Sequence, residues 1–388
     1  MHRTKSKERT RPALALLLLA LLAGCGSSWQ AEVIAPDGSI FAVDRQVLEE
    51  LAAENGMELE EGLPLEQVLW AAGHAAVERL AVVDPEGARR EFDWPATTAG
   101  TVDPLWLAAG RLSIGEATLD VARLEVEPPA LLDRVQAGIV DLAPAAAAAL
   151  GLPAPEGATG SGLDAPRAGH VLLLFLDGLG YVRYSEAAAA GLMPNLAALE
   201  PPLAGLTVYP PATSVATAAL LSGAPPPING VGRRGIRQTE AQTLFDVAAS
   251  AGLRVVAVEG NALAFNLRGA EITLSGDRDG DGSTDDNVLA NALAAAGGGM
   301  PDLLYVHFHG IDDAGHTYGP GAPEEEAAIR RVDAAVGRLL DALPGDTLIY
   351  IFADHGLHRV VGEEEEEAGN HGHLIERDMF VPIWIVEK

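Results

Sequence analysis

Five short motifs carry the side chains of this sequence that could perform chemistry. They are L-D-G at Asp177, P-P-A-T-S at Thr213, D-D-A-G-H from Asp312 to His316, A-D-H-G at Asp354 and His355, and N-H-G-H at His371. Together they supply three carboxylates, three imidazoles and one hydroxyl. Carboxylates and imidazoles are common ligands of zinc and of similar divalent metals. This set suits two metal ions and a nucleophile, and it predicts a metal-dependent phosphoryl-transfer enzyme.

The hydroxyl of Thr213 is the candidate nucleophile. A threonine hydroxyl attacks poorly at neutral pH, but coordination to a metal lowers its pKa. Two metals about 3.5–4 Å apart can hold a phosphoryl group, one activating the attacking oxygen and the other stabilising the leaving oxygen. We therefore expect a phosphothreonine intermediate at Thr213, which water then hydrolyses.

Each of these residues also has a structural interpretation. Asp177 and Asp354 could form strand-end turns, and Thr213 could cap a helix at 217–221. His309, His358 and His373 are interpreted as ordinary polar groups, although His373 could replace His371 as a ligand because it lies two residues further on. The five motifs together, each at the end of a predicted strand or on the loop after one, favour the metal site.

Strand and helix patterns alternate from His170 onward. Continuous apolar segments predict buried strands at 170–176, 253–258, 302–308, 346–352 and 379–386, and helical spacing predicts helices at 193–199, 217–221 and 324–343. Apolar strands separated by helices indicate an α/β fold whose mostly parallel sheet is covered by helices on both faces. Functional side chains should then lie just beyond the carboxyl ends of the strands, where Asp177, Asp312 and Asp354 occur.

The motifs resemble those of the alkaline phosphatase superfamily, most closely its type I phosphodiesterase/nucleotide pyrophosphatase branch. The resemblance covers about residues 168–388, and its most specific part is D-D-A-G-H-T-Y-G-P at 312–320. It implies an alkaline-phosphatase-like fold and two divalent metals. The mixed oxygen and nitrogen ligands suit zinc, with manganese and iron as the alternatives. The implied ligands are Asp177, Asp354, His355 and the Thr213 oxygen for one metal, and Asp312, His316 and His371 for the other.

The sequence departs from that family at one position near the nucleophile. Nucleotide pyrophosphatases have an asparagine that contacts a phosphate oxygen, and N-G-V-G-R-R places Arg234 there. A guanidinium can donate to the same oxygen, so Arg234 is a candidate phosphate contact, although a solvated loop arginine is the alternative. The modified-cysteine pattern of sulfatases is absent, which disfavours sulfate esters.

An acidic segment at 277–287 resembles a calcium-binding loop. Asp277, Asp279, Asp281 and Asp285 occupy the first, third, fifth and ninth positions, with Gly282 at the sixth. The twelfth position is Val288 instead of glutamate, so the bidentate ligand is missing. The alternative is a solvated turn before a helix at 287–296, and the acidic run 363–367 is interpreted as an exposed loop with no ligand role.

The N-terminal residues predict export and lipidation. Basic residues precede an apolar segment at 13–23, which ends in L-A-G-C at Cys25. This order resembles the lipobox of bacterial lipoproteins and implies that Cys25 is lipidated, which would anchor the protein to a bacterial membrane outside the cytoplasm. Cys25 is the only cysteine, so an intramolecular disulfide is impossible. The net charge of −29 disfavours duplex nucleic acid as a partner.

The chain divides into three predicted parts: a signal peptide at 1–24, a small α+β accessory domain at 25–128 and a catalytic domain at 129–388. Alternating strand patterns with D-G and P-E-G turns indicate β-hairpins in the accessory domain. A segment at 140–160 resembles the helix that normally follows the last strand of the superfamily. This implies a circular permutation, with 129–167 as the usual C-terminal segment, and predicts that helix 142–150 packs beside the strand at 379–386.

Two functions remain open at this point. The first is a lipid-anchored hydrolase of phosphodiesters, pyrophosphates or phosphomonoesters, acting on small-molecule or envelope substrates. The second is a catalytically weak surface lipoprotein whose residues 30–127 bind a partner or an envelope polymer. The complete ligand set favours the first, because a non-catalytic protein could lose any of those residues.

Overall fold

The computed structural model of the chain describes residues 29–388, apart from 55–56, 58, 60–62, 99–104, 108–109, 115–116, 161–162, 165, 281 and 361–366. The predicted signal peptide, Cys25 and Asp281 therefore lie outside the described residues. No helix in the described part of the chain combines the length and the apolar character needed to cross a membrane.

The larger of two domains contains an eight-stranded sheet in the order β10-β12-β19-β16-β11-β15-β13-β14. Its ladders are parallel except where β19 pairs with β12 and β16. The central strands are apolar on both faces, as β11 (HVLLLFL) shows, because helices cover both sides of the sheet. The strands are β10 (Val135–Gly138), β11 (His170–Leu176), β12 (Leu203–Leu206), β13 (Val255–Glu259), β14 (Glu271–Leu274), β15 (Leu303–Phe308), β16 (Thr347–Phe352) and β19 (Phe380–Glu387).

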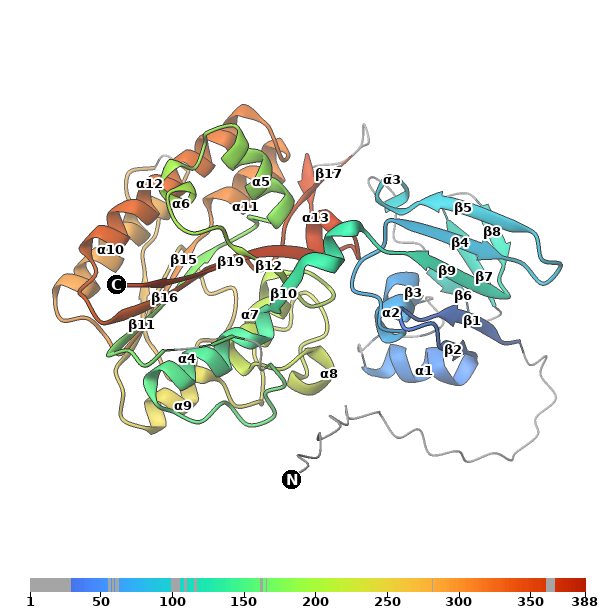
Figure 1. The fold of residues 1–388 in the computed structure, drawn as a ribbon, viewed down its shortest axis with the longest axis horizontal. Coiled ribbons are helices and arrows are strands. Elements are labelled where there is room, and N and C mark those ends of the chain that lie inside the picture. The colour runs from blue at the N-terminus through green and yellow to red at the C-terminus, as the bar shows by residue number, and fades with distance from the viewer. Residues whose placement is uncertain are drawn as a thin grey trace, which may run out of the picture.

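Helices pack on both faces of this sheet (Figure 1). On one face lie α5 (Tyr181–Ala189), α6 (Pro194–Ala197), α10 (Asp285–Gly297), α11 (Gly310–Tyr318) and α12 (Pro323–Ala342). On the other lie α4 (Leu142–Leu150), α7 (Thr213–Ser222) and α9 (Leu244–Ser250). Short elements complete the domain: α8 (Pro226–Asn229), β17 (His358–Arg359), β18 (Gly369–Asn370) and α13 (Glu376–Met379). The expected α/β fold class is confirmed.

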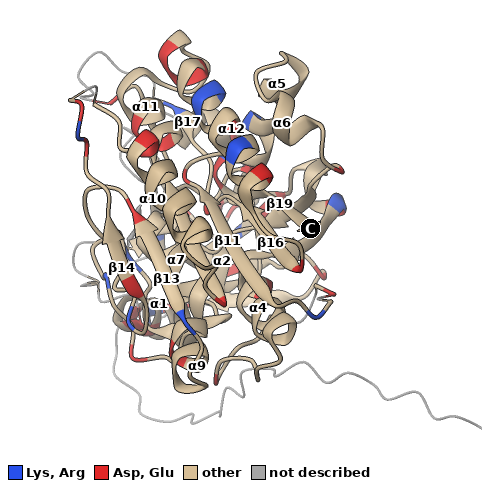
Figure 2. Cartoon of the chain, turned by 90° about the vertical axis from the view of Figure 1, so that its left-hand side faces the viewer, with Lys and Arg blue, Asp and Glu red and all other residues tan. Residues whose placement is uncertain are grey.

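The sequence of α12 explains why a helix forms there. Pro323 occupies its first turn together with three glutamates, whose charge is favourable near a helix N-terminus. Its apolar residues, among them Ile329, Val332 and Val336, are buried in the hydrophobic core of the domain. Acidic and basic residues are interspersed on its outer face (Figure 2).

The smaller domain, residues 29–127, is built from two sheets, and the predicted hairpins β1–β2 and β4–β5 are present. One sheet has the order β2-β1-β9-β4-β5 and the other the order β3-β6-β7-β8. The elements are β1 (Ala31–Ile34), β2 (Ile40–Val43), α1 (Arg45–Glu54), β3 (Leu63–Pro64), α2 (Leu65–Ala71), β4 (Arg79–Val83), β5 (Arg89–Asp93), α3 (Trp94–Thr98), β6 (Leu105–Leu107), β7 (Arg111–Ile114), β8 (Ala117–Asp120) and β9 (Arg123–Glu127).

The two domains share a hydrophobic core. Buried residues of the small domain, including Leu65 and Trp94, form one cluster with Tyr209, Leu374 and Phe380 of the large domain. The backbone N–H of Val77 also donates to the carbonyl of Leu374 over 2.7 Å. The small domain is therefore docked against the segment that connects β18 to β19.

The segment before β11 belongs to the large domain. β10 pairs with β12 at one edge of the large sheet, and α4 spans the predicted residues 142–150. Its neighbours are α7, α9 and β11, whereas we expected it beside the last strand, β19. Helix α4 packs on β11, and β16 lies between β11 and β19 in the sheet, so α4 is not beside β19. The circular permutation itself stays a hypothesis.

Candidate metal centre and nucleophile

The predicted site residues come together at one edge of the large sheet. Asp177 follows β11, Asp312 lies in the first turn of α11 after β15, and Asp354 and His355 follow β16. Neighbouring parallel strands end at the same edge, which brings these loops together. Thr213 is the first residue of α7, so the helix begins four residues earlier than predicted and Thr213 does not cap it from outside.

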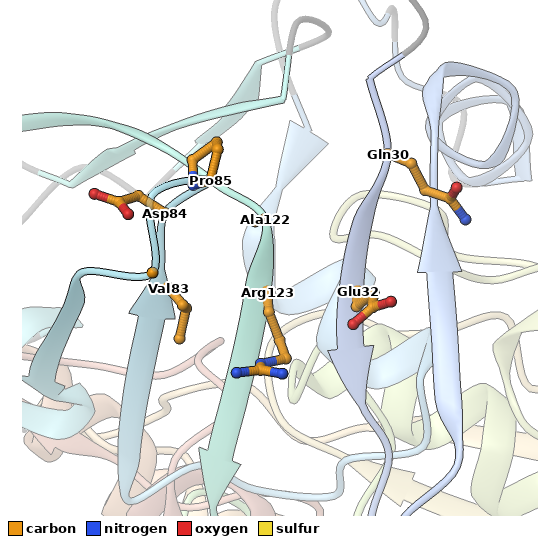
Figure 3. Close-up of a pocket in the computed structure, with 8 residues that line it drawn as sticks. Gln30, Glu32, Val83, Asp84, Pro85, Ala122 and Arg123 are labelled. Carbon is orange, nitrogen blue, oxygen red and sulfur yellow. The ribbon is translucent and has the colours of Figure 1, made fainter.

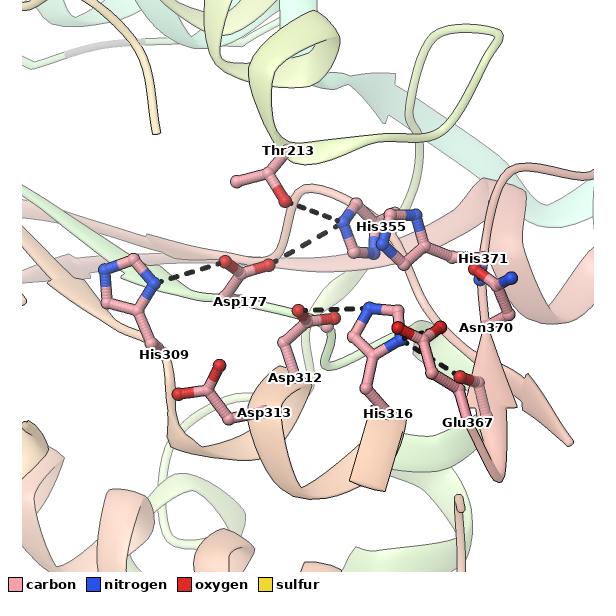
Figure 4. Close-up of polar contacts among 12 residues, drawn as sticks. Asp177, Thr213, His309, Asp312, Asp313, His316, His355, Glu367, Asn370 and His371 are labelled. Carbon is pink, nitrogen blue, oxygen red and sulfur yellow. Dashed lines mark hydrogen bonds and ion pairs between the residues drawn. The ribbon is translucent and has the colours of Figure 1, made fainter. Parts of the chain in front are cut away.

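One half of the site is centred on Nε2 of His355 (Figure 4). This nitrogen lies 3.1 Å from Asp354 Oδ2, 3.2 Å from Thr213 Oγ1 and 3.7 Å from Asp177 Oδ1. These are the four residues that the resemblance assigns to one metal. The side chains of Asp177, Asp354 and His355 are buried, whereas Thr213 is half-buried.

The other half consists of Asp312, His316 and His371, whose potential ligand atoms lie within 4.8 Å of one another. His316 Nε2 is 3.5 Å from Asp312 Oδ2, and its Nδ1 is 3.0 Å from the carbonyl of Gly369. His371 Nδ1 is 2.7 Å from the carbonyl of Pro211. When each Nδ1–H donates to its carbonyl, each Nε2 is left unprotonated and able to bind a metal.

The two halves adjoin each other. Atoms of Asp177, Asp312 and His355 also lie within 4.8 Å, and the rings of His355 and His371 stack with centroids 3.7 Å apart. His373, the alternative to His371, points elsewhere, with its Nδ1 3.2 Å from Glu66. His358 contacts Asp378 at 2.9 Å, in line with its interpretation as an ordinary polar group.

Unpartnered buried atoms show that the pocket fits metal ions. Asp354 accepts from the N–H of Gly178 through Oδ1, but its Oδ2 has no hydrogen-bond partner among the described residues. Asp177 is held through Oδ2 by His307, and its Oδ1 is equally unpartnered, as are Asp312 Oδ1 and His355 Nδ1. Buried polar atoms rarely lack partners. Asp177 and Asp312, which each carry such an oxygen, offer ligand atoms within 4.8 Å of each other and of His355, and a cation bound there would satisfy them.

The electrostatics of the site lead to the same conclusion. Burial raises the pKa values of Asp312 and Asp354 well above 3.8, and the neighbouring charge of Asp177 adds to this effect. Burial acts in the same direction on Asp177, but hydrogen bonds from His307 and His309 outweigh it and hold its pKa well below 3.8. Burial also lowers the pKa of His355 to about 4 and that of His371 well below 6.5, so both imidazoles are neutral at physiological pH.

A buried network behind Asp177 was missed from the sequence. His307, on β15, lies 3.1 Å from Asp177 Oδ2 and 3.0 Å from Glu259, the last residue of β13. His309 lies 3.0 Å from the same Glu259 oxygen and 3.6 Å from Asp177, so it is no isolated polar group. The available signal was a histidine and a glutamate inside two apolar strands, since buried ionisable groups need partners.

Two further residues reach the second half of the site. The carboxylate of Glu367 is 3.2 Å from His316 Nδ1, although the acidic run was expected to have no role there. Arg234 donates from Nη2 to the carbonyl of His371 and to Asn370 Oδ1, the latter over 3.2 Å. The guanidinium therefore lies beside a predicted metal ligand, and its contact with a phosphate stays a prediction.

The predicted calcium ligands have other contacts. Asp277 accepts from the N–H groups of Gly280 and Gly282, and Asp285 accepts from those of His309 and Gly310. Asp285 is the first residue of α10 and is buried against the loop that leads to Asp312. Both carboxylates are thus used within the protein. Calcium binding at Asp277, Asp279, Asp281 and Asp285 stays a prediction.

Two hollows in the surface differ in their relation to these residues. The larger, of about 420 Å³, lies on the small domain and is lined by residues such as Glu32, Asp84 and Arg123 (Figure 3). It contains none of the predicted site residues. A hollow of about 330 Å³ is lined by His371 and Arg234 and therefore adjoins the metal centre.

Comparison with known proteins supports the assignment. Residues 267–378 match the sequence model of the family "Type I phosphodiesterase / nucleotide pyrophosphatase". The resemblance to this family is confirmed. The matched segment contains Asp312, His316, Asp354, His355 and His371, whereas Asp177 and Thr213 precede it.

Similar curated proteins are transferases. The mouse GPI ethanolamine phosphate transferase 3 catalytic subunit is 33% identical over 75 residues, which are 19% of this chain and 7% of that protein. GPI ethanolamine phosphate transferase 2 of Schizosaccharomyces pombe is 31% identical over 98 residues, 23% of this chain and 12% of that protein. The chain thus spans about a tenth or less of the length of these relatives.

Among solved structures, phosphonoacetate hydrolase of Sinorhizobium meliloti 1021 matches in its complexes with phosphonoformate and phosphonoacetate. The identities are 21% and 20%, and the TM-scores 0.40 and 0.42. The matches cover 53% and 54% of this chain and 60% and 62% of the hydrolase chain.

Proposed function

We propose that this protein is a metal-dependent phosphoric ester hydrolase that acts on phosphodiesters, pyrophosphates or phosphomonoesters through a phosphothreonine intermediate at Thr213. One observation carries the proposal. The Thr213 hydroxyl and the free oxygens of Asp177 and Asp354 converge on His355 Nε2, within 3.7 Å. A hydroxyl beside three predicted metal ligands is an arrangement that supports metal-assisted nucleophilic attack.

Two divalent metals, zinc being our proposal, would be held by Asp177, Asp354, His355 and Thr213, and by Asp312, His316 and His371. When bound, they supply Lewis-acid activation of the attacking oxygen and stabilisation of the leaving oxygen. The protein fixes the ligands from behind: His307 holds Asp177, Gly178 holds Asp354, and backbone carbonyls orient the two outer histidines.

The proposed chemical step at Thr213 has the following balance. Thr213 Oγ forms a bond to phosphorus and loses its proton to solvent, while the bond from phosphorus to the ester oxygen breaks. The leaving oxygen takes up a proton from solvent and departs as the free alcohol. Thr213 begins α7, and the first N–H groups of a helix are available to bind an anion. The transferred phosphoryl group is therefore formed where the helix can hold its oxygens. Water then attacks phosphorus and gives up a proton, the bond from phosphorus to Oγ breaks, and Oγ takes up a proton to restore the threonine hydroxyl.

Two versions of this function differ in the molecule that accepts the phosphoryl group from Thr213, which is either water or an alcohol. The similar curated proteins are called ethanolamine phosphate transferases, which favours an alcohol instead of water as a second candidate acceptor. The first half of the reaction at Thr213 is the same in both versions. Product analysis in the presence of glycerol or ethanolamine distinguishes them, because a transferase produces a new ester and a hydrolase produces the free phosphate product.

We further propose that Cys25 is lipidated and that the protein acts outside the cytoplasm, anchored to a bacterial membrane, on small-molecule or envelope phosphate esters. The order of basic residues, apolar segment and L-A-G-C supports this. The net charge of −29 supports a substrate other than duplex nucleic acid. The alternative of a catalytically weak lipoprotein is less favoured, because such a protein would not need the complete set of metal ligands.

The test combines metal content with turnover. The full chain is freed of metal by a chelator and reloaded with Zn²⁺ or Mn²⁺, and hydrolysis of bis-p-nitrophenyl phosphate and p-nitrophenyl phosphate is measured. We expect about two metal ions per chain and turnover that is lost with the metal and regained with it. Binding of two ions without turnover of either ester would favour the lipoprotein alternative.

A further inference from the structure

The hollow of about 330 Å³ beside the metal centre is formed by both domains. Met57, Pro64 and Gln67 of the small domain line one side, and Tyr209, Arg233, Arg234 and the segment from Asn370 to His373 line the other. Because His371 is a predicted metal ligand, whatever fills this cleft lies next to the reacting phosphorus. Its volume is at the lower end of small-ligand sites, which are about 300–1,000 Å³.

A buried carboxylate fixes the small-domain side of the cleft. Glu66 precedes Gln67 in α2 and is 1% exposed. It accepts from Leu374 N–H over 2.9 Å and from the Tyr209 hydroxyl over 3.2 Å, both in the large domain. Moving α2 away would leave these buried groups unpaired, at a cost of about 1–3 kcal/mol each. These contacts hold α2, and with it the Gln67 side of the cleft, against the large domain.

The described residues that line the cleft are basic or neutral, in contrast to the acidic composition of the chain. None of its described lining residues is acidic, although the chain has 55 Asp and Glu against 26 Lys and Arg. Arg233 and Arg234 both lie at its wall, and Arg234 is held by the His371 carbonyl and Asn370. Arg233 is exposed, and its guanidinium has no partner among the described residues. Within the described lining, Arg233 is thus a cation that an anionic group in the cleft can contact.

We infer that this cleft binds the organic part of the substrate, and that this part carries a negative charge in addition to the reacting phosphate. Arg233 then recognises that charge, and the small domain provides the opposite wall. The inference rests on the proposed function and narrows its substrate class to phosphate esters with a second anionic group, such as a carboxylate or another phosphate.

The experiment compares two chromogenic diesters of 4-nitrophenyl phosphate. Their second ester group is butyl in one and 3-carboxypropyl in the other, so the two differ mainly in one negative charge. The measured quantity is the ratio of kcat/KM for the carboxypropyl ester to that for the butyl ester. We expect the zinc-loaded full chain to prefer the anionic ester and Arg233→Ala to lower the ratio about tenfold, as for a charge-assisted hydrogen bond. Arg237→Ala, an exposed arginine outside the cleft, should leave the ratio unchanged.

Variants of the opposite wall test the small domain. Met57 is half-buried, so a charged side chain there can reach solvent. Met57→Lys should raise the ratio and Met57→Glu should lower it, and opposite shifts cannot arise from a shared folding defect. If the enzyme hydrolyses both diesters and neither Arg233 nor Met57 variants change the ratio, the inference is wrong while the proposed function stands. If neither diester nor either p-nitrophenyl ester of the first test is hydrolysed, both fail.

Discussion

The Glu66 carboxylate accepts a hydrogen bond of 2.9 Å from the backbone N–H of Leu374, three residues after His371. The same oxygen accepts from Trp94 Nε1, and the second oxygen contacts His373 and the Tyr209 hydroxyl. One buried side chain of the small domain thus holds the segment that presents a predicted metal ligand. This contact links the small domain to the predicted metal centre, although Glu66 is not one of the predicted ligands.

The first prediction follows from that contact. Glu66→Ala leaves several buried donors unpaired, so we expect kcat to fall about tenfold or more, with a loss of stability of about 1–3 kcal/mol for each donor. Glu66→Gln keeps one acceptor oxygen and should restore part of kcat. Both are measured well below the unfolding temperature of each variant.

The matched control is Glu325→Gln, which disturbs another buried carboxylate, paired with Arg183 at 2.5 Å between α5 and α12. It should lower stability while leaving kcat close to that of the unmodified protein. If Glu66 and Glu325 variants lose stability equally and neither changes kcat, Glu66 has no positioning role.

The sequence predicted those features of the fold and of the site that a short local pattern encodes. It did not predict contacts between residues that lie far apart in the chain. The long apolar strands β11, β15 and β16 were predictable, and their ends located Asp177, Asp312 and Asp354. The short strands β10 and β12, of four residues each, carry too few residues for a pattern. Glu66 and Leu374 are 308 residues apart, so nothing in either local sequence indicates their contact.

Thr213 provides the second prediction. Thr213→Ala should lower kcat by about a thousandfold or more, since removing a covalent nucleophile has effects of that size. Metal content should stay close to normal, because six of the seven ligand residues remain. Thr213→Ser keeps a hydroxyl and should retain measurable turnover. A phosphorylated residue 213 should be detectable by mass spectrometry after trapping at low pH in the unmodified protein, and it should be absent from the alanine variant. Turnover by Thr213→Ala near the normal rate would contradict the mechanism.

The third prediction concerns the second metal. His316→Ala removes one of three ligands, so we expect metal content to fall from about two ions to one and turnover to fall by several orders of magnitude. Asp312→Ala should have the same effect. The control is His170→Ala, because His170 lies at the opposite end of β11 and contacts only the Pro301 carbonyl among the hydrogen bonds found for its side chain. Unchanged metal content in His316→Ala would remove the two-metal interpretation.

The fourth prediction concerns membrane attachment. Cys25→Ser removes the only thiol of the chain, so lipidation at that position becomes impossible. We expect the expressed protein to fractionate with membranes when Cys25 is present, and the serine variant to be released or to remain unprocessed. Metabolic labelling with a fatty-acid analogue provides a direct readout. A serine variant that is membrane-bound to the same extent and still labelled would show that the lipobox interpretation is wrong.

The last prediction uses the pKa of Asp312. Burial, together with the charge of Asp177, raises this pKa in the folded, metal-free protein well above its ordinary value of 3.8. A carboxyl whose pKa is higher in the folded state than in the unfolded state stabilises the fold in its protonated form. That stabilisation is complete below 3.8 and is lost as the pH rises through the raised pKa.

Asp312→Asn resembles the protonated form at every pH. The metal-free variant should therefore have a higher Tm than the metal-free unmodified protein at pH 8, and the difference should shrink steadily as the pH is lowered toward 4. Zinc should reverse the order, because it stabilises only the protein with the complete ligand set. Thermal unfolding at a series of pH values, with chelator or with zinc, measures both effects. If the Tm difference in the absence of metal does not depend on pH, ionisation of Asp312 does not destabilise the folded, metal-free protein. The electrostatic argument for the metal centre would then be wrong.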